Sequence, residues 1–244
     1  MLPMTLPFVA MILAGGLGTR LRQVVSDRPK PLAFVGDVPF LEILVSSLAR
    51  KGVRDFVLLT GYMGEMIEEH FRNRRLDGIR LHFVQEDEPL GTGGAVRNAA
   101  RFATDPTLLV NGDTFFDADL KRLYEYHYEK GGEVTLSLIR VDDVTRYGAV
   151  VIDEDGRITG FREKQEENTG PGYINAGLSL LSGEFIRGLP DLGSFSMERD
   201  VFPSTALSGS MFGLAQEGAF FDIGTPESYE AFSDFARDKG FGLK

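Results

Sequence analysis

Apolar and polar positions alternate along the first half of the chain in blocks that predict strands and helices in turn. Apolar runs at Phe8–Leu13, Val53–Thr60 and Leu108–Val110 predict buried strands, and residues 81–85 alternate as a further strand. The helices predicted around them, from apolar spacings of three and four or from composition, span residues 41–48, 64–74, 95–102 and 120–127. This alternation predicts an α/β fold with a mainly parallel sheet covered by helices.

The second half of the chain is less regular, and its pattern favours short strands joined by turns. The strands predicted there are Val134–Val141, Val150–Ile152, Tyr173–Leu181 and Phe220–Ile223. Gly156 predicts the turn of a hairpin that continues into Arg157 and Ile158. Thr225 and Pro226 predict the start of a last helix, with the threonine as its N-cap and the proline in its first turn.

The first predicted strand runs directly into a turn that contains Gly15, Gly16 and Gly18, followed by Thr19 and Arg20. Glycines after a strand let backbone N–H groups approach an anion closely. A Walker loop requires a Gly-Lys pair, which the chain does not contain, and a dinucleotide fingerprint requires glycine at position 21. The turn therefore predicts a triphosphate pocket of another kind.

Lys30 lies between Pro29 and Pro31, which restrict its backbone and lower the entropy lost when its ammonium group is positioned. Together with Arg20, it brings positive charge to the glycine turn. Fixed cations aimed at the transferring phosphate are a main source of rate in phosphoryl-type transfer. We therefore expect both side chains to bind phosphate.

Asp113 and Asp222 each follow an apolar strand run, although they are far apart in the sequence. Magnesium prefers one or two carboxylates together with phosphate oxygens and water. We therefore expect the two aspartates to share one Mg²⁺ ion as the cofactor. Taken alone, each aspartate is equally compatible with an ordinary turn or a helix cap.

Composition excludes several other classes of protein. The chain has 244 residues and a net charge of −10, from 26 basic and 36 acidic residues, so we expect no nucleic-acid partner. It contains no cysteine, which excludes disulfides, thiolate chemistry and cysteine-type zinc sites. The apolar N-terminus carries no Lys or Arg and is interrupted early by Gly15 and Gly16. We therefore expect a cytoplasmic enzyme with no membrane partner.

These motifs resemble the signature of the sugar-phosphate nucleotidyltransferases, also called nucleoside-diphosphate-sugar pyrophosphorylases. The similarity runs through nearly the whole chain, in the segments Leu13–Pro31, Gln85–Gly94, Asn111–Asp113, Glu163–Lys164, Asn175–Gly177 and Asp222–Pro226. Within this family the chain is most similar to the D-glycero-D-manno-heptose 1-phosphate guanylyltransferases. The resemblance implies a single Rossmann-like domain, residues 1–244, with three αβα layers. Its nucleotide-binding half extends to about residue 115, and a smaller, antiparallel sugar-phosphate-binding half follows from about residue 116.

The resemblance also assigns roles to individual residues. It implies catalytic contacts to phosphate from Arg20, Lys30 and Lys164. It implies nucleotide binding by Leu13, Ala14, Gly15, Gly16, Gly18, Thr19, Gln85, Gly91, Thr92, Gly112 and Asp113. It implies sugar-phosphate binding by Gly148, Glu163, Lys164 and Asn175, and metal binding by Asp113 and Asp222.

The implied reaction joins a sugar 1-phosphate to a nucleoside triphosphate and releases pyrophosphate. The favoured substrates are GTP and heptose 1-phosphate, and GDP-heptose would serve surface-polysaccharide synthesis. Mannose 1-phosphate with GTP, or glucose 1-phosphate with UTP, dTTP or CTP, are the alternatives within the class. Outside it, a non-catalytic, nucleotide-sensing regulatory subunit is the alternative, although such a subunit would not need Arg20, Lys30, Asp113 and Asp222. The oligomeric state is left open, with a homodimer as one outcome.

Overall fold

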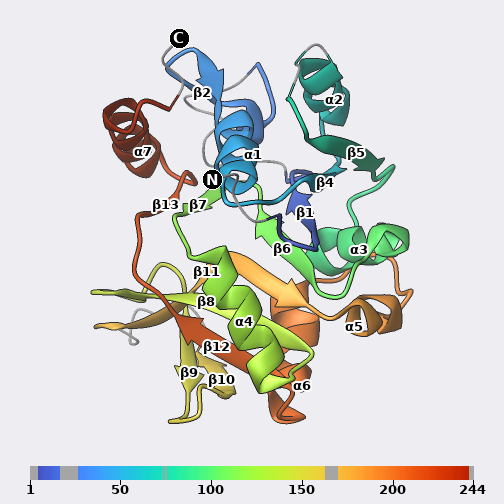
Figure 1. The fold of residues 1–244 in the computed structure, drawn as a ribbon, viewed down its shortest axis with the longest axis vertical. Helices are drawn as coiled ribbons and strands as arrows, with labels where there is room; N and C mark the ends of the chain where they lie inside the picture. Colours follow the sequence, from blue (N-terminus) through green and yellow to red (C-terminus); the bar gives the residue numbers. More distant parts are fainter. Residues whose placement is uncertain (1–4, 17–26, 73, 75, 163–169, 242–244) are drawn as a thin grey trace. The chain divides into compact units, whose positions relative to one another are not determined.

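The computed structural model describes residues 5–16, 27–72, 74, 76–162 and 170–241. Contacts within the chain divide it into two compact units. The first unit comprises Met1–Pro89, Val110–Phe115 and Phe221–Lys244, and the second comprises Leu90–Leu109 and Phe116–Phe220. Each unit is therefore made of segments that are distant in the sequence (Figure 1).

The first unit is built on the parallel strands β1 (Val9–Leu13), β4 (Asp55–Thr60) and β5 (Arg80–Gln85), which pair in that order (Figure 1). Strand β6 (Thr107–Asn111) begins in the second unit, and its end lies beside β1 in the first. Strands β1 and β4 are largely buried, as expected of apolar strands in a parallel sheet covered on both faces. The predicted α/β fold with a mainly parallel sheet is confirmed.

Helices α1 (Phe40–Arg50) and α2 (Gly64–Arg72) belong to the same unit and agree with the helices predicted at residues 41–48 and 64–74. A short helical turn, η2 (Lys30–Leu32), leads into a hairpin of β2 (Phe34–Val35) and β3 (Val38–Pro39). Strands β7 (Thr114–Phe116) and β13 (Phe220–Asp222) pair with each other, and α7 (Pro226–Asp238) follows β13. Helix α7 begins with Thr225 as its N-cap, as predicted.

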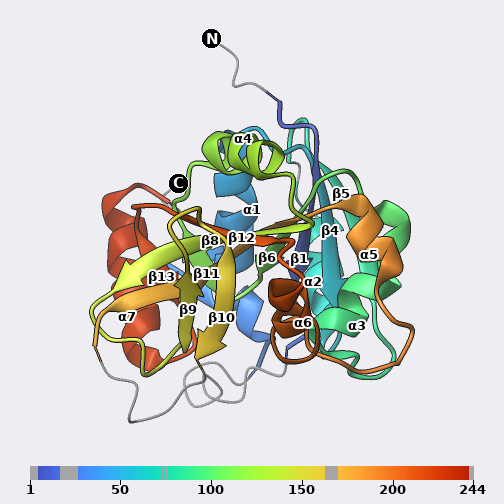
Figure 2. The ribbon, with the colours of Figure 1, turned by 90° about the horizontal axis from the view of Figure 1, so that it is seen from below.

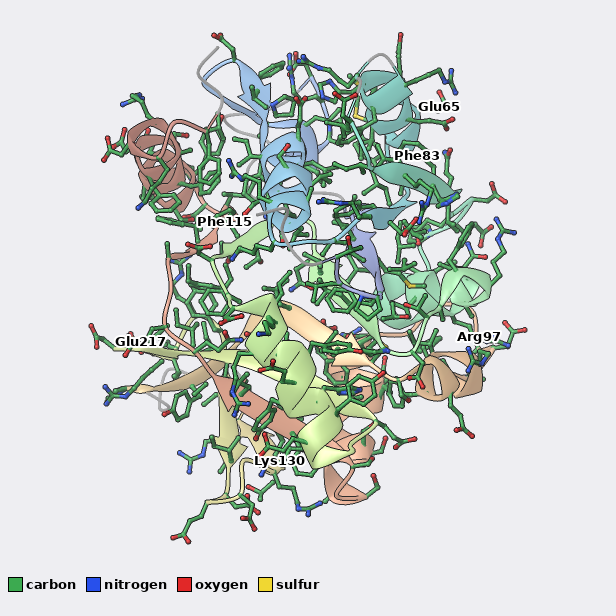
Figure 3. All side chains as sticks on the ribbon, viewed as in Figure 1. Glu65, Phe83, Arg97, Phe115, Lys130 and Glu217 are labelled. Carbon is green, nitrogen blue, oxygen red and sulfur yellow. The ribbon has the colours of Figure 1, made fainter. Side chains whose placement is uncertain are left out.

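A cluster of phenylalanine rings packs α7 against the rest of the first unit. The Phe232 ring is fully buried, and its centroid lies 5.0 Å from that of Phe40, 5.2 Å from that of Phe115 and 5.5 Å from that of Phe221. Figure 3 labels Phe115, which β7 contributes to this cluster. Edge-to-face and tilted ring pairs add stabilisation beyond their buried area. The cluster therefore holds β7, β13 and α7 in fixed relative positions.

The second unit contains a sheet in the order β10-β9-β11-β8-β12 (Figure 2). Its pairings are antiparallel except for the parallel β8–β12 pair. The strands are β8 (Val134–Val141), β9 (Ala149–Ile152), β10 (Ile158–Arg162), β11 (Gly172–Leu181) and β12 (Met211–Ala215). Helix α4 (Leu120–Lys130) contacts β8, β11 and β12. The remaining helical segments of this unit are α3 (Gly91–Asn98), η3 (Ala100–Phe102), α5 (Gly183–Gly188), the π-helical η4 (Met197–Val201) and α6 (Phe202–Leu207).

The strands predicted at Val134–Val141 and Tyr173–Leu181 and the hairpin around Gly156 are confirmed, and Gly156 has the positive φ of +78° that its turn requires. The helix predicted at residues 95–102 instead begins at Gly91 and gives way to a short 3₁₀ turn after Asn98. Glycine disfavours a helix when nothing else holds the backbone in place. Packing within the second unit overrides that preference in α3. Among the described residues, no helix combines the length and the hydropathy needed to cross a bilayer.

Candidate active site

The predicted nucleotide-binding residues of the first unit lie where its parallel strands end. The carboxyl ends of parallel strands share one edge of a sheet, which is where ligands bind in open α/β folds. The Ala14 backbone N–H donates to the Leu59 carbonyl (2.8 Å), and the Gly112 N–H donates to the Leu13 carbonyl (3.0 Å). A Cβ atom on Gly112 would lie only 2.3 Å from that Leu13 oxygen. Glycine is therefore required where the chain leaving β6 passes the end of β1.

The two described glycines of the turn after β1 differ in how much space surrounds them. A Cβ atom on Gly15 would lie 2.9 Å from Glu86 Oε1 and 3.1 Å from the Gly61 nitrogen. Gly16 is exposed, and a Cβ atom there would meet no atom of the described residues within 4 Å. Gln85 is the last residue of β5, and its side chain is exposed. These residues share the strand-end edge, and their nucleotide contacts stay a prediction.

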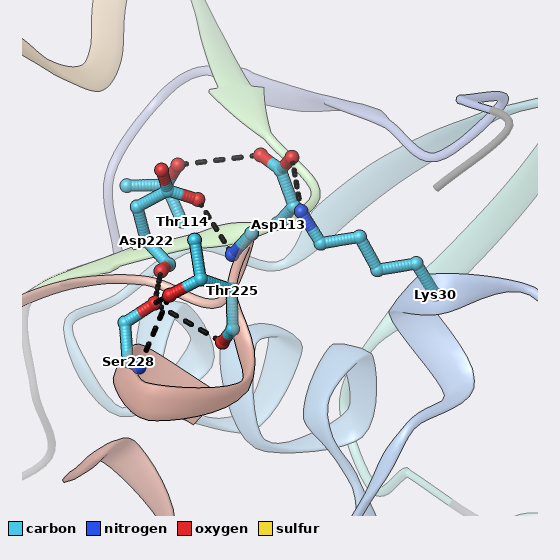
Figure 4. Close-up of polar contacts among 7 residues, drawn as sticks. Lys30, Asp113, Thr114, Asp222, Thr225 and Ser228 are labelled. Atoms are coloured by element: carbon cyan, nitrogen blue, oxygen red, sulfur yellow. Dashed lines mark hydrogen bonds and ion pairs between the residues drawn. The ribbon is translucent and has the colours of Figure 1, made fainter. Parts of the chain in front are cut away.

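The structure brings together the predicted phosphate-binding lysine and a predicted metal ligand. Lys30 Nζ donates to Asp113 Oδ2 over 2.8 Å, joining residues 83 positions apart (Figure 4). The Lys30 side chain is only 11% exposed, whereas that of Asp113 is 45% exposed. Pro29 and Pro31 flank the lysine and are both buried, so its backbone is fixed at the base of the site. An ammonium group has three donors, and this one therefore retains the chemistry to bind an oxyanion as well.

Asp113 and Asp222 lie on neighbouring segments that the backbone holds in register. The Ile223 N–H donates to the Asp113 carbonyl over 3.0 Å, which ties the end of β13 to the start of β7. Figure 4 shows the two carboxyl groups on the same side of these segments. The Gly224 N–H donates to Asp222 Oδ1 (2.8 Å), and the Thr114 hydroxyl lies 3.3 Å from Asp113 Oδ1. The two strand-end aspartates are therefore brought together.

The N-terminus of α7 contacts the Asp222 backbone through Ser228, which was not predicted, next to the predicted N-cap Thr225. The Ser228 hydroxyl donates to the Asp222 carbonyl over 2.5 Å, and the Ser228 N–H donates to the Thr225 hydroxyl over 3.4 Å (Figure 4). A sequence signal exists in Thr-Pro-Glu-Ser, where an N-cap threonine precedes a serine by three positions. Tyr229 also donates to the Phe34 carbonyl, and burial raises the pKa of this tyrosine. The start of α7 is thus fixed at several points.

The donor set at this edge fits magnesium. Asp113 and Asp222 offer carboxylate oxygens, the hard ligands that Mg²⁺ prefers. The described part of the chain holds no group of three or more His, Cys, Asp or Glu side chains placed to bind a metal. A two-carboxylate site leaves coordination positions for substrate phosphate oxygens and water, which is the usual arrangement for Mg²⁺ at phosphates. Magnesium itself stays a prediction for this chain.

The other predicted nucleotide-binding residues, Gly91 and Thr92, start α3 in the second unit. The Thr92 hydroxyl donates to Glu198 Oε2 (2.7 Å) and accepts from the Met197 N–H (2.8 Å). Gly91 has a φ of +68°, which favours glycine, and a Cβ atom there would lie 2.5 Å from the Phe195 carbonyl oxygen. Close packing on residues 195–198 thus accounts for the local sequence, and nucleotide contacts by Gly91 and Thr92 stay a prediction.

Two of the predicted sugar-binding residues are described, and both belong to the second unit. Asn175 lies at an irregularity in β11, where its Oδ1 accepts from the Gly177 N–H over 3.0 Å. Gly148 has a φ of +77° and donates its N–H to the Val144 carbonyl over 2.9 Å, immediately before β9. Both residues shape a turn or a bulge, which is a common way to aim a side chain or backbone group. Their contacts with a sugar phosphate stay a prediction.

The other predicted site residues, Gly18, Thr19, Arg20, Glu163 and Lys164, lie outside the described residues.

Comparison with known proteins gives the family. The model of the nucleotidyl transferase family matches residues 9–239. The chain belongs to the nucleotidyl transferase family. Two similar members are D-glycero-alpha-D-manno-heptose 1-phosphate guanylyltransferases. That of Aneurinibacillus thermoaerophilus is 38% identical over 221 residues, which cover 90% of this chain and 94% of the relative. That of Campylobacter jejuni is 36% identical over 226 residues, which cover 91% and 97%.

A solved structure supports the same family. The crystal structure of HddC from Yersinia pseudotuberculosis superposes with a TM-score of 0.83 and 34% identity, covering 93% of this chain and 99% of HddC. A second HddC crystal structure, complexed with GMP-PN, superposes with a TM-score of 0.82. The nucleotidyl transferase fold therefore extends over nearly the whole chain. The strand-end edge with Lys30, Asp113 and Asp222 is its candidate active site.

Proposed function

We propose that this chain transfers GMP from GTP to D-glycero-D-manno-heptose 1-phosphate, giving GDP-heptose and pyrophosphate. One cluster supports this function most directly: Lys30, Asp113 and Asp222 lie together at the strand ends of a nucleotidyl transferase. The relatives named as heptose 1-phosphate guanylyltransferases match the chain over almost their full length. The GMP-PN complex of HddC supports a guanine nucleotide.

In this reaction an oxygen of the sugar phosphate attacks the α-phosphorus of GTP, and the bond from that phosphorus to the bridging oxygen of pyrophosphate breaks. The nucleophile is already an anion, so no general base is required. The task of the protein is to align the two phosphates and to neutralise their charge. Lys30 supplies a fixed ammonium group for this purpose, and from the sequence we assign similar roles to Arg20 and Lys164.

Asp113 and Asp222 would hold the magnesium ion in this proposal. When bound, the ion would neutralise phosphate charge and orient the α-phosphate. Asp113 also keeps the Lys30 ammonium group in place, so one carboxylate would serve both cationic groups. Within the first unit, the backbone groups of Leu13, Ala14 and Gly15 and the amide of Gln85 are assigned to the nucleoside.

We assign the sugar phosphate to Gly148, Glu163, Lys164 and Asn175. A carboxylate that accepts from sugar hydroxyls leaves them unpaired when it is removed, at a cost of about 1–3 kcal/mol. The Glu163→Ala variant should therefore raise the Michaelis constant for the sugar phosphate about 5- to 150-fold and barely change that for GTP. An equal rise in both constants would contradict this assignment.

A screen of pyrophosphate release tests the reaction itself. Four triphosphates, GTP, UTP, dTTP and CTP, are each combined with heptose, mannose and glucose 1-phosphates. GTP with heptose 1-phosphate should give the highest kcat/KM, and mannose 1-phosphate, which lacks one hydroxymethylene carbon, should be a weaker substrate. If glucose 1-phosphate with UTP or dTTP reacted faster, the family would stand and the proposed substrates would be wrong. Nucleotide binding without transfer in every combination would favour a regulatory subunit.

A further inference from the structure

A glutamate is placed against the glycine turn at the nucleotide edge of the first unit. Glu86 follows the last residue of β5, and its N–H donates to the Thr60 carbonyl over 2.8 Å, so the β4–β5 ladder continues to this residue. Its carboxylate lies close to two glycines, Gly15 and Gly61. A Cβ atom would lie 2.9 Å from Glu86 Oε1 at Gly15 and 2.5 Å from the same oxygen at Gly61. Glycine at both positions therefore leaves room for this carboxylate.

A carboxylate is a surprising group at a site for a triphosphate. It accepts hydrogen bonds but donates none, and it repels phosphate oxygens. Glu86 therefore does not bind phosphate oxygens directly, as the Lys30 ammonium group can. Its position beside Gly15 instead matches the part of the edge assigned to the nucleobase. The ligand group that a carboxylate recognises there must carry hydrogen-bond donors.

Among the nucleobases, guanine has the edge that suits a carboxylate best. Its N1–H and its exocyclic N2 amino group are adjacent donors, so one carboxylate can accept from both, and charge-assisted bonds of this paired kind are strong. Uracil and thymine place a single N–H between two carbonyl oxygens, and cytosine places its amino group beside an acceptor nitrogen. A carboxylate that meets these bases faces an acceptor, which disfavours them.

We propose that Glu86 is the residue that selects guanine, its carboxylate accepting from N1–H and the N2 amino group. This inference rests on the proposed use of GTP. Glu86 then determines nucleotide specificity, while Lys30, Asp113 and Asp222 serve the phosphates. The glycines at positions 15 and 61 would thus be required for base selection through the space that they leave for Glu86.

Analogues of GTP that differ only at C2 of the base test this role. Inosine triphosphate lacks the amino group, and xanthosine triphosphate carries a carbonyl oxygen in its place. The wild-type enzyme should use GTP with a kcat/KM about 10- to 150-fold above that for inosine triphosphate, since one charge-assisted hydrogen bond is lost. It should reject xanthosine triphosphate, whose C2 oxygen would face the carboxylate.

The Glu86→Gln variant should reverse this pattern. Its preference for GTP over inosine triphosphate should fall toward unity, and it should gain activity with xanthosine triphosphate, because the amide N–H₂ can donate to the C2 oxygen. Glu88→Gln makes the same change at an exposed residue two positions further along and should keep the wild-type preference. A gain with one analogue cannot arise from misfolding, so this readout separates base reading from a structural role.

The outcomes distinguish this inference from the proposed function. A wild-type enzyme that does not transfer GMP from GTP overturns the proposed function. A wild-type enzyme that uses GTP and inosine triphosphate equally well overturns the role of Glu86 without any variant. A Glu86→Gln variant that keeps the wild-type preference and gains nothing with xanthosine triphosphate also overturns it. Glu86 would then have a structural role beside Gly15 and Gly61.

Discussion

The ion pair between Lys30 and Asp113 can be measured apart from catalysis by a double-mutant cycle. Lys30→Met removes the charge and keeps a long apolar side chain, and Asp113→Asn removes the opposite charge and keeps the shape. In the wild-type protein the two groups are 2.8 Å apart, with the lysine 11% exposed and the aspartate 45% exposed. The prediction is that the two substitutions are clearly non-additive in the free energy of unfolding.

The size of the coupling follows from these distances and exposures. Two unit charges 2.8 Å apart attract by about 6 kcal/mol at an effective dielectric constant of about 20. Removing the lysine from water offsets much of this attraction, and the half-exposed aspartate is further screened by solvent. We therefore expect each single variant to lower the free energy of unfolding by about 1–3 kcal/mol. The coupling energy between them should be about 1–2 kcal/mol.

Urea unfolding followed by far-UV circular dichroism measures this cycle, since the chain contains no tryptophan. The exposed pair of Glu68 and Arg72 on α2, whose side chains are 39% and 70% exposed, is the matched control. A cycle of Glu68→Gln and Arg72→Met should give a coupling below about 0.5 kcal/mol. If the coupling between Lys30 and Asp113 were no larger than that of the control pair, the view of Lys30 as a cation fixed in place by Asp113 would be refuted.

Further predictions concern metal, packing, pH and the glycine turn. Asp222→Asn should lower the rate of pyrophosphate release by orders of magnitude at every Mg²⁺ concentration, without changing the unfolding midpoint. EDTA should abolish the wild-type rate. Full activity of the variant would remove Asp222 from the metal site. Phe232→Ala should lower the free energy of unfolding by about 3–5 kcal/mol in urea titrations, because it leaves a cavity where a fully buried ring was packed. A loss below about 1 kcal/mol would contradict this packing. Burial lowers the pKa of His127, so only the unfolded chain takes up its proton as the pH falls below about 6.5. Stability should therefore decline there in the wild-type protein and decline less in His127→Asn. Gly16→Ala should leave the unfolding midpoint unchanged but weaken GTP binding in calorimetry, whereas Gly112→Ala should destabilise the protein itself.

Asp113 was predictable because it follows β6, whose end lies at the carboxyl edge that the parallel strands share, whereas Asp222 ends β13, which pairs with β7 outside that sheet. Asp113 and Asp222 were singled out from the apolar runs before them, and the fold ties their backbones together through the Ile223 N–H. The proline-flanked Lys30 was likewise predicted to be fixed, although its partner was not. Hydrophobic periodicity identifies where each strand ends, but which strand end lies next to which depends on the order of strands in the sheet.

The contacts that were missed involve residues whose surroundings in the sequence are uninformative. Glu86 belongs to the acidic stretch Gln85–Glu88, where a glutamate is normally solvated. Ser228 follows a recognisable N-cap, but its bond to the Asp222 carbonyl depends on how β13 enters α7. Thr92 contacts residues more than a hundred positions away. Such contacts depend on tertiary structure, which local pattern does not encode.

The glycines of the nucleotide-binding motifs show why a motif match underdetermines function. Each was predicted to bind the nucleotide, yet Gly112 avoids the Leu13 carbonyl, Gly15 leaves room for Glu86 and Gly91 avoids the Phe195 carbonyl. Gly16 differs because no atom of the described protein would obstruct a side chain there. Requirements of the fold and of the ligand therefore act on adjacent residues of one motif. Loss of activity on replacing such a glycine identifies a ligand contact only where, as at Gly16, the described residues leave room for a Cβ atom.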